Sequence, residues 1–295
     1  MTQQVDDQFN QTHRYPWRIE PITLETVSRL RLGWTSRFDR EDVGRLVFEN
    51  PGLSLWIPDS GEYVVGGPWR HRSEIASVME LVAPNGAVPL LKAISAASAE
   101  AGKRLIIASE HHESRQNAFY LSADYELVEE IVIYELSNLG NETAEPSPLR
   151  FEVADLGDPN VFRELLTLDH QSFPWLWWNS REEFKNYSES FGVNIYIGRD
   201  KEQRPVSYLG VTRFRNWGHL DRIAVDPALQ GHGYGRQSLD WAVHSLVQSG
   251  ARRIGLSTQA RNVRSRRLYE RYGFQRVPAQ DYALFGQWLG PSEPM

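Results

Sequence analysis

Cysteine is absent from the 295 residues of the sequence. Disulfides, thiolate metal sites and cysteine nucleophiles are therefore excluded, because each of them needs a thiol. The sequence also has no apolar run that approaches the roughly 20 residues needed to span a bilayer. Its first residues, MTQQVDDQFNQTHR, lack the cationic and apolar segments of a secretory signal. We expect a cytoplasmic protein with no membrane partner.

Positive charge is not in excess either, because 32 Lys and Arg residues stand against 38 Asp and Glu residues, a formal net charge of −6. A general nucleic-acid binder relies on a broadly basic surface, so we expect no nucleic-acid partner. No spacing of histidines or carboxylates suggests a metal site. The segment 251–277 departs from the acidic balance, with eight arginines against one acid, Glu270, and suits a small polyanionic ligand.

Length and composition favour two globular domains. Hydrophobic residues make up 41% of the chain and charged residues 24%, which is ordinary for a globular protein, and domains usually hold about 100–200 residues. The polar stretch SNLGNETAEPSPLR separates two regions of apolar periodicity and is typical of a linker. We predict a flexible N-terminus, a first domain, a linker, a second domain and a tail, over residues 1–14, 15–137, 138–149, 150–290 and 291–295.

The second domain has the pattern of an α+β fold. Helical spacing of apolar residues predicts two helices, and three strand-like runs follow them. The turn residues RDKEQRP between the first two runs suggest a hairpin, so we expect an antiparallel meander. Asp158 or Pro159 is placed to begin the first helix, and Asn262 and Gly273 frame the last one. The expected order is strand 150–156, helices 158–173 and 180–190, strands 193–199, 205–214 and 218–225, a helix ending before Gly250, strand 252–259, helix 263–272 and strand 274–278.

A faint repeat links the two halves of the chain. Aligning residues 102–128 with residues 251–277 places Tyr120 on Tyr269 and Asp124 on Gly273, and Asp is one of the few residues that tolerates a left-handed helix cap. The first half has VAPNGAVPLL where the second half has three alternating glycines. We therefore predict tandem copies of one fold, of which the first is degenerate.

The stretch ALQGHGYGRQS carries those glycines, Gly231, Gly233 and Gly235, between a strand and a long helix. Backbone N–H groups and the positive end of a helix can converge there on a phosphate, and glycine lets the backbone approach closely. A dinucleotide loop would need glycine in place of Arg236, and a P-loop would need Lys and then Ser or Thr after Gly235. A tight turn without a ligand is the plain alternative.

The pattern Gln230-x-x-Gly233-x-Gly235 follows RIAVDP and precedes Asn262 and LYERYGF by about 27 residues. In this order and spacing it resembles the coenzyme loop and the second motif of the GCN5-related N-acetyltransferase (GNAT) family, over roughly residues 150–288. The resemblance implies acetyl-coenzyme A as cofactor. It also implies an α+β fold of two tandem acyl-coenzyme A N-acyltransferase domains, each with a mixed, mostly antiparallel sheet flanked by helices.

The resemblance assigns roles to particular residues. Tyr269 occupies the position of the general acid toward the leaving thiolate. Strand residues 223–225 would splay from the neighbouring strand, and the backbone N–H of Val225 would meet the thioester carbonyl. The implied contacts to acetyl-coenzyme A are Ile223, Ala224, Val225, Gln230, Gly231, His232, Gly233, Tyr234, Gly235, Arg236, Asn262 and Ser265.

The general base has more than one candidate. His219 stands six residues before Val225, where some family members place a glutamate. In a regular strand the side chains of these two residues would point to the same face of the sheet. Histidine titrates near neutrality, which suits a base. Asp221 is the second candidate, and a base acting through water is the third. Other members place the base on the following strand, where this chain has Ser257.

Three tryptophans, Trp175, Trp177 and Trp178, lie in the short loop SFPWLWWNS. In the implied fold this loop borders the acceptor pocket, so they would form an aromatic acceptor-binding face. Alternatively, they wedge the two repeats together.

The leading functional hypothesis is transfer of an acetyl group to a primary amine of a small molecule or peptide, with the active site in the C-terminal domain. Acetylation of an aminothiol conjugate, as by mycothiol synthase, is an alternative, since that enzyme also has two such domains. A non-catalytic acyl-coenzyme A sensor and a pure scaffold are the others. The oligomeric state stays open.

Overall fold

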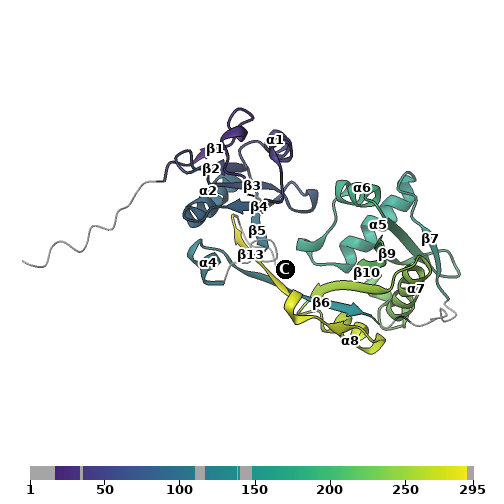
Figure 1. Ribbon diagram of the computed structural model, residues 1–295. Coiled ribbons are helices and arrows are strands. Elements are labelled where there is room, and N and C mark those ends of the chain that lie inside the picture. Colours follow the sequence, from purple (N-terminus) through teal and green to yellow (C-terminus); the bar gives the residue numbers. More distant parts are fainter. Residues whose placement is uncertain (1–16, 34–35, 110–116, 138, 140–147, 291–295) are drawn as a thin grey trace, which may run out of the picture.

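The computed structural model describes residues 17–33, 36–109, 117–137, 139 and 148–290. The predicted flexible N-terminus, most of the predicted linker and the tail lie outside the described residues. Within them, thirteen strands form one sheet in which twelve lie in the order β1-β2-β3-β4-β5-β13-β6-β11-β10-β9-β8-β7, and β12 pairs with β6. Helices cover both faces of this sheet (Figure 1).

The elements of the N-terminal half are β1 (Glu20–Pro21), η1 (Val27–Arg29), α1 (Arg40–Glu49), β2 (Ser54–Trp56), β3 (Tyr63–Pro68), η2 (Trp69–His71), β4 (Ile75–Val82), α2 (Ala87–Glu100), β5 (Leu105–Ser109), α4 (Asn117–Ser122) and β6 (Glu126–Leu136). Those of the C-terminal half are β7 (Arg150–Val153), α5 (Pro159–Ser172), η3 (Trp175–Trp177), α6 (Arg181–Glu189), β8 (Val193–Arg199), β9 (Pro205–Phe214), β10 (Trp217–Val225), η4 (Pro227–Leu229), α7 (Tyr234–Gln248), β11 (Arg253–Gln259), α8 (Val263–Tyr272), β12 (Gln275–Arg276), η5 (Pro278–Gln280) and β13 (Tyr282–Trp288).

Local capping chemistry sets the helix boundaries as predicted. The Asp158 carboxylate accepts a hydrogen bond from the Asn160 N–H at 2.8 Å, and Pro159 opens α5. The Asn262 side chain accepts from the Ser265 N–H at 3.1 Å at the start of α8, and Gly273 ends that helix with φ 115°. Strands β8, β9 and β10 form the predicted antiparallel meander.

Each half has a mixed, mostly antiparallel sheet, as predicted. The parallel pairs are β4 with β5 and β10 with β11, and the other pairings are antiparallel. The two halves also agree at the aligned positions: Tyr120 and Tyr269 are both buried, and Asp124 adopts a left-handed φ of 65° where Gly273 has 115°. The chain is therefore built as two tandem α+β units.

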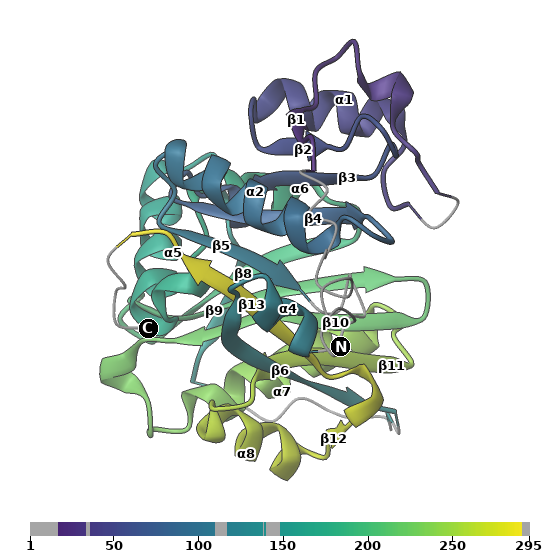
Figure 2. The ribbon, with the colours of Figure 1, turned by 90° about the vertical axis from the view of Figure 1, so that its left-hand side faces the viewer.

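Strands β6 and β13 cross between the two halves. Residues 131–136 of β6, which belongs to the N-terminal half, pair with β11 of the C-terminal half. In return, β13 from the end of the chain inserts between β5 and the first part of β6 (Figure 2). The sequence-based prediction ended with the strand at 274–278 and missed β13, whose pairing partners lie more than 140 residues earlier in the chain.

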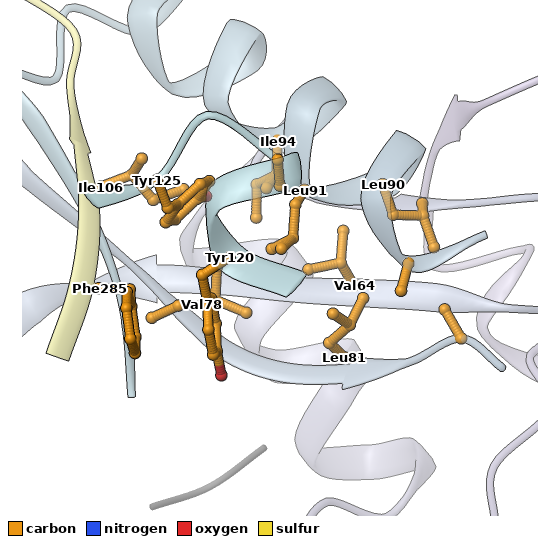
Figure 3. Packing of buried hydrophobic residues seen from close by; sticks show 14 of the residues in the cluster. Val64, Val78, Leu81, Leu90, Leu91, Ile94, Ile106, Tyr120, Tyr125 and Phe285 are labelled. Atoms are coloured by element: carbon orange, nitrogen blue, oxygen red, sulfur yellow. The ribbon is translucent and has the colours of Figure 1, made fainter. Parts of the chain in front are cut away.

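The exchanged strands complete each other's cores. Phe285 of β13 stacks on Tyr120 with the ring planes 3° apart and the centroids at 4.3 Å, inside the core of the N-terminal half (Figure 3). Tyr134 of β6 packs at 6.1 Å from Tyr269 in the core of the C-terminal half. Neither half can bury its core without a strand from the other.

No helix among the described residues is both long and apolar enough to cross a membrane.

Truncation of Phe285 tests this exchange. We expect Phe285→Ala to lower the free energy of unfolding by about 3–5 kcal/mol, because it removes a fully buried ring and leaves a cavity against Tyr120. Urea denaturation followed by fluorescence measures the loss. Leu127→Ala, on the neighbouring strand and 49% exposed, should change stability by less than about 0.5 kcal/mol. Equal effects of the two substitutions would argue against the exchanged packing.

Candidate active site

Strands β10 and β11 separate partway along their length. They pair in parallel from Trp217 with Arg253 to Leu220 with Leu256, and no further. Beyond that point β10 pairs only with β9, while Ser257, Thr258 and Gln259 of β11 pair with β6. Asp221 stands at the point of separation, where the register of β10 against β9 shifts by one residue. Such a bulge bends its strand and increases the local twist, so it accounts for the divergence.

A cavity of about 320 Å³ lies at this opening. Seven residues predicted for the site line it: Trp177, His219, Asp221, Ile223, Asn262, Ser265 and Tyr269. The other predicted residues, Ala224, Val225, 230–236, Trp175 and Trp178, are not part of its lining. Sequence reasoning missed several lining residues, among them Arg70, Phe173, Asn179, Glu183, Tyr187 and Arg222.

The glycine loop leaves backbone donors unused at the start of α7. Gly231 and Gly233 have φ of 90° and 86°, values that favour glycine, and a Cβ on Gly231 would meet nothing within 4 Å. Among the described residues, the N–H groups of residues 231–235 make no hydrogen bond to the protein. Five consecutive free donors at the start of a 15-residue helix form a site for an anion.

Gln230 ties this loop to its surroundings. Its Nε2 donates to the Val225 carbonyl at 3.1 Å, and its Oε1 accepts from the Arg264 guanidinium of α8. The Val225 carbonyl also accepts from Ser172 Oγ, whereas the next residue, Asp226, donates its N–H to the Val206 carbonyl of β9. Adjacent residues of a strand alternate between its two edges, so the Val225 N–H faces away from β9, toward the side where β11 has diverged.

His219 and Asp221 form a hydrogen-bonded pair on the cavity wall. Nδ1 of His219 lies 2.8 Å from Oδ1 of Asp221, and Oδ2 of Asp221 accepts from the hydroxyls of Thr212 and Tyr187 at 2.7 and 2.6 Å. Burial, followed by the Asp221 carboxylate, raises the pKa of Tyr187 well above its ordinary value, so Tyr187 stays a donor. The pair therefore has a fixed geometry.

The prediction that the side chains of His219 and Val225 point to the same face of the sheet is wrong. Asp221 is an extra residue in β10 relative to β9, and a one-residue shift moves the following side chains to the other face of the sheet. Val225 accordingly packs toward Gly235 at the start of α7, whereas His219 lines the cavity. The bulge cannot be read from the local sequence, because it is defined by the pairing with β9.

Tyr269 reaches the cavity from α8 and is 4% exposed. Burial raises the pKa of its hydroxyl above the ordinary value, and the hydrogen bond with Ser265 offsets only part of that rise. The phenol therefore remains protonated across the neutral range.

Trp175 and Trp177 lie in η3 and Trp178 directly follows it, and the three side chains have different neighbours. Trp177 lines the cavity and packs edge to face on Trp69 of η2, with centroids 5.8 Å apart. Trp175 stacks on Trp288 of β13 and lies under the Arg72 guanidinium, at the junction of the two halves. Trp178 stacks on His170. Trp175 and Trp177 thus both contact the other half, as the wedge alternative has it, and Trp177 also lines the cavity.

Arg222 and Asp169 form a buried ion pair behind the cavity. Asp169 is 0% exposed and also accepts from the Tyr208 hydroxyl and from the Asn179 N–H at 2.8 Å. The Arg222 guanidinium reaches Tyr208 and the Trp177 carbonyl at 3.0 Å. This network joins α5, β9, β10 and η3, so it fixes the rear wall of the cavity.

The corresponding helix start in the N-terminal half is filled by the protein itself. Glu62 is 1% exposed, and its carboxylate accepts from the Gly86 N–H at 2.6 Å and from Asn85 Nδ2 at 3.1 Å. A Cβ on Gly86 would clash with the Ile57 side chain, in contrast to the open space at Gly231. A carboxylate already occupies the place where a phosphate could approach α2.

The fold thus combines two parallel strands that diverge around a cavity with free amides at the start of the helix that follows β10. Residues 161–274 match the model of the acetyltransferase (GNAT) family. This agrees with the resemblance found in its motifs.

Over most of its length the chain is similar in fold to solved structures, one of them a tandem GNAT protein. A GCN5-related N-acetyltransferase from Sphaerobacter thermophilus superposes with a TM-score of 0.61 at 15% identity, over 94% of this chain and 97% of that one. A tandem GNAT protein from the clavulanic acid biosynthesis pathway gives 0.57 at 12% identity, over 93% and 99%. A mycothiol acetyltransferase from Beutenbergia cavernae is 38% identical over 69 residues, which is 23% of this chain and 23% of that protein's length.

Removal of the Arg222 charge tests the buried network. We expect Arg222→Met to cost about 3–5 kcal/mol of unfolding free energy, because it leaves the Asp169 carboxylate buried without its cation. Denaturant titration measures the change. Arg45→Met, which breaks an exposed ion pair with Asp42 on α1, serves as the control and should leave the midpoint almost unchanged. A stable Arg222→Met protein would contradict the assigned network.

Proposed function

We propose that the chain is an acetyl-coenzyme A-dependent N-acetyltransferase whose working site lies in the C-terminal half. The observation that carries this proposal is that β10 parts from β11 at a cavity lined by His219 and Tyr269, and is followed by a helix start whose amides at residues 231–235 have no acceptor among the described residues. The match of residues 161–274 to the acetyltransferase (GNAT) family supports the reaction class.

Residues at the start of α7 and on α8 would hold the coenzyme. The amides of residues 231–235, with Arg236 beside them, would hold the pyrophosphate, and Asn262 and Ser265 of α8 would border the pantetheine arm. Acetyl-coenzyme A supplies an acetyl group activated as a thioester. The Val225 N–H, on the free edge of β10, would donate to the thioester carbonyl oxygen, which is where negative charge develops.

His219 and Tyr269 would move the protons. An alkyl amine arrives as the ammonium ion, so Nε2 of His219 takes its proton while Asp221 holds the ring through Nδ1. The amine nitrogen then bonds to the acetyl carbon as the bond from that carbon to sulfur breaks. Tyr269, kept protonated by burial, gives its proton to the departing thiolate and regains one from the new amide nitrogen, which must lose its second proton.

The N-terminal half would be a degenerate copy without a coenzyme site of its own. Glu62 places a negative charge on the Gly86 N–H, where a phosphate would have to bind, and Gly86 has no space above it. The Glu62 carboxylate would repel a phosphate that approached the Gly86 N–H, so acetyl-coenzyme A would bind only at α7. One active site per chain follows.

The acceptor would be a primary amine on a small molecule or on a peptide. A cavity of about 320 Å³ suits a small ligand or one residue of a chain, and Trp177 and Phe173 supply an aromatic wall. The partial identity with a mycothiol acetyltransferase favours an aminothiol conjugate as the second candidate. Rates with an amine panel that includes aminothiols distinguish the two candidates.

Binding and turnover of acetyl-coenzyme A test the proposal directly. Coenzyme A at 100 times its dissociation constant should raise the unfolding free energy by about 2.7 kcal/mol. Free thiol should be released slowly from acetyl-coenzyme A alone and faster with an amine. Coenzyme binding without amine-dependent thiol release would indicate a sensor. A melting temperature that does not change when coenzyme A is added would indicate a scaffold.

The role of Tyr269 has its own test. Tyr269→Phe should lower kcat by about 100-fold, within the usual range for loss of a general acid, with little change in acetyl-coenzyme A affinity. Single-turnover kinetics measures the chemical step. Tyr272→Phe removes a hydroxyl on the same helix that donates to Asp240 outside the cavity, and should leave kcat near the wild-type value. An unchanged chemical step in Tyr269→Phe would discard the acid role.

A further inference from the structure

Arg70 reaches the cavity from the opposite half of the chain. It lies in η2 between β3 and β4, yet it lines the same cavity as His219 and Asp221 of β10. Its backbone is left-handed, with φ 52° and ψ 39°, and the next residue, His71, also has φ 52°. Non-glycine residues hold this conformation only where their surroundings enforce it, and such residues gather at functional sites.

The Arg70 guanidinium is only partly used by the protein. Its Nε and Nη2 donate to Oδ1 of Asn179, at 3.0 Å for Nε. Its nearest carboxylate, Glu183, is 3.7 Å away and lies closer to His71, at 2.8 Å from Nδ1. Nη1 donates to no protein atom among the described residues, although the side chain is only 19% exposed. Two N–H donors therefore remain available at the cavity.

The contrast with Arg222 identifies Arg70 as the residue open to a ligand. Arg222 lines the same cavity, but its charge is neutralised by direct contact with the buried Asp169. Arg70 has only the Glu183 carboxylate at 3.7 Å, which also pairs with His71. Burial and the nearby charge of Arg222 lower the pKa of Arg70 to about 10, and Glu183 and Asp169 offset only part of that effect. An anion bound at Arg70 would favour its charged form.

We propose that Arg70 recognises a carboxylate on the acceptor, so that the acceptor is a primary amine that also carries a carboxylate, an amino acid or a peptide end. This proposal rests on the acetyltransferase function proposed above. A planar guanidinium with free N–H groups matches a carboxylate in geometry as well as charge. The amine would lie at the His219 and Asp221 end of the cavity, and the aromatic wall of Phe173 and Trp177 favours apolar groups between the two.

Matched acids and amides test this specificity. The wild-type protein is assayed by thiol release with α-amino acids, ω-amino acids and dipeptides, each beside its carboxamide. We expect at least one acid to exceed its amide in kcat/KM by 10-fold or more. Arg70→Met should lower kcat/KM for that acid by about 10- to 100-fold, mainly through KM, and leave the amide unchanged. Arg70→Lys, which keeps the charge, should restore part of the preference.

Arg72→Met is the matched control. Arg72 lies two residues away and also contacts the C-terminal half, where its guanidinium donates to the Trp175 carbonyl, but it does not line the cavity. Its removal should leave the ratio of acid to amide unchanged. A wild-type enzyme that treats acids and amides alike, or an Arg70→Met or Arg70→Lys enzyme with the wild-type ratio, overturns the carboxylate site.

Calorimetry distinguishes failure of the Arg70 carboxylate site from failure of the proposed acetyltransferase function. The N-acetylated form of each acid and its amide are titrated into the protein in the presence of coenzyme A. If no amine supports thiol release, the acetyltransferase proposal fails, while tighter binding of an acid than of its amide, lost in Arg70→Met, still supports recognition at Arg70. Equal or absent binding of every acid and amide overturns it.

Discussion

The separation of β10 from β11 is the constraint on which the site depends. The two strands pair for four residues and then part at Asp221, the extra residue of β10. This single bulge does three things. It opens the edge of β10 at Val225, it makes room for the cavity, and it places Asp221 beside His219 on the cavity wall. A regular parallel pair would use the same backbone donors for sheet hydrogen bonds and leave no opening.

The divergence needs support from the other half of the chain. After β11 leaves β10, its residues Ser257, Thr258 and Gln259 are held by residues 131–133 of β6. Without that strand the outer edge of β11 would have unpaired backbone groups. The N-terminal half therefore remains necessary to the site although its own helix start is filled by Glu62, and the exchange of β6 and β13 makes the two halves structurally inseparable.

Features set by near neighbours in the chain were predictable from the sequence. Asp158, Asn262 and Gly273 fix helix ends through contacts within a few residues, and the glycine loop is likewise a local pattern. Features set by distant pairing were not. The bulge at Asp221 overturned the predicted alternation, β13 pairs with strands of the first half, and Arg70 comes to the cavity through the packing of η2 on η3 and α6. Sequence periodicity carries no information about such contacts.

Amide hydrogen exchange with and without coenzyme A tests most directly whether the free donors at the start of α7 bind the coenzyme. The amides of residues 231–235 have no acceptor within the described part of the chain and should exchange fast in the free protein. Coenzyme A should slow them markedly and leave the start of α2, at Gly86 and Ala87, unchanged. Slowed exchange at α2, or no change at residues 231–235 under saturating coenzyme A, would contradict the assignment of the site to the C-terminal half.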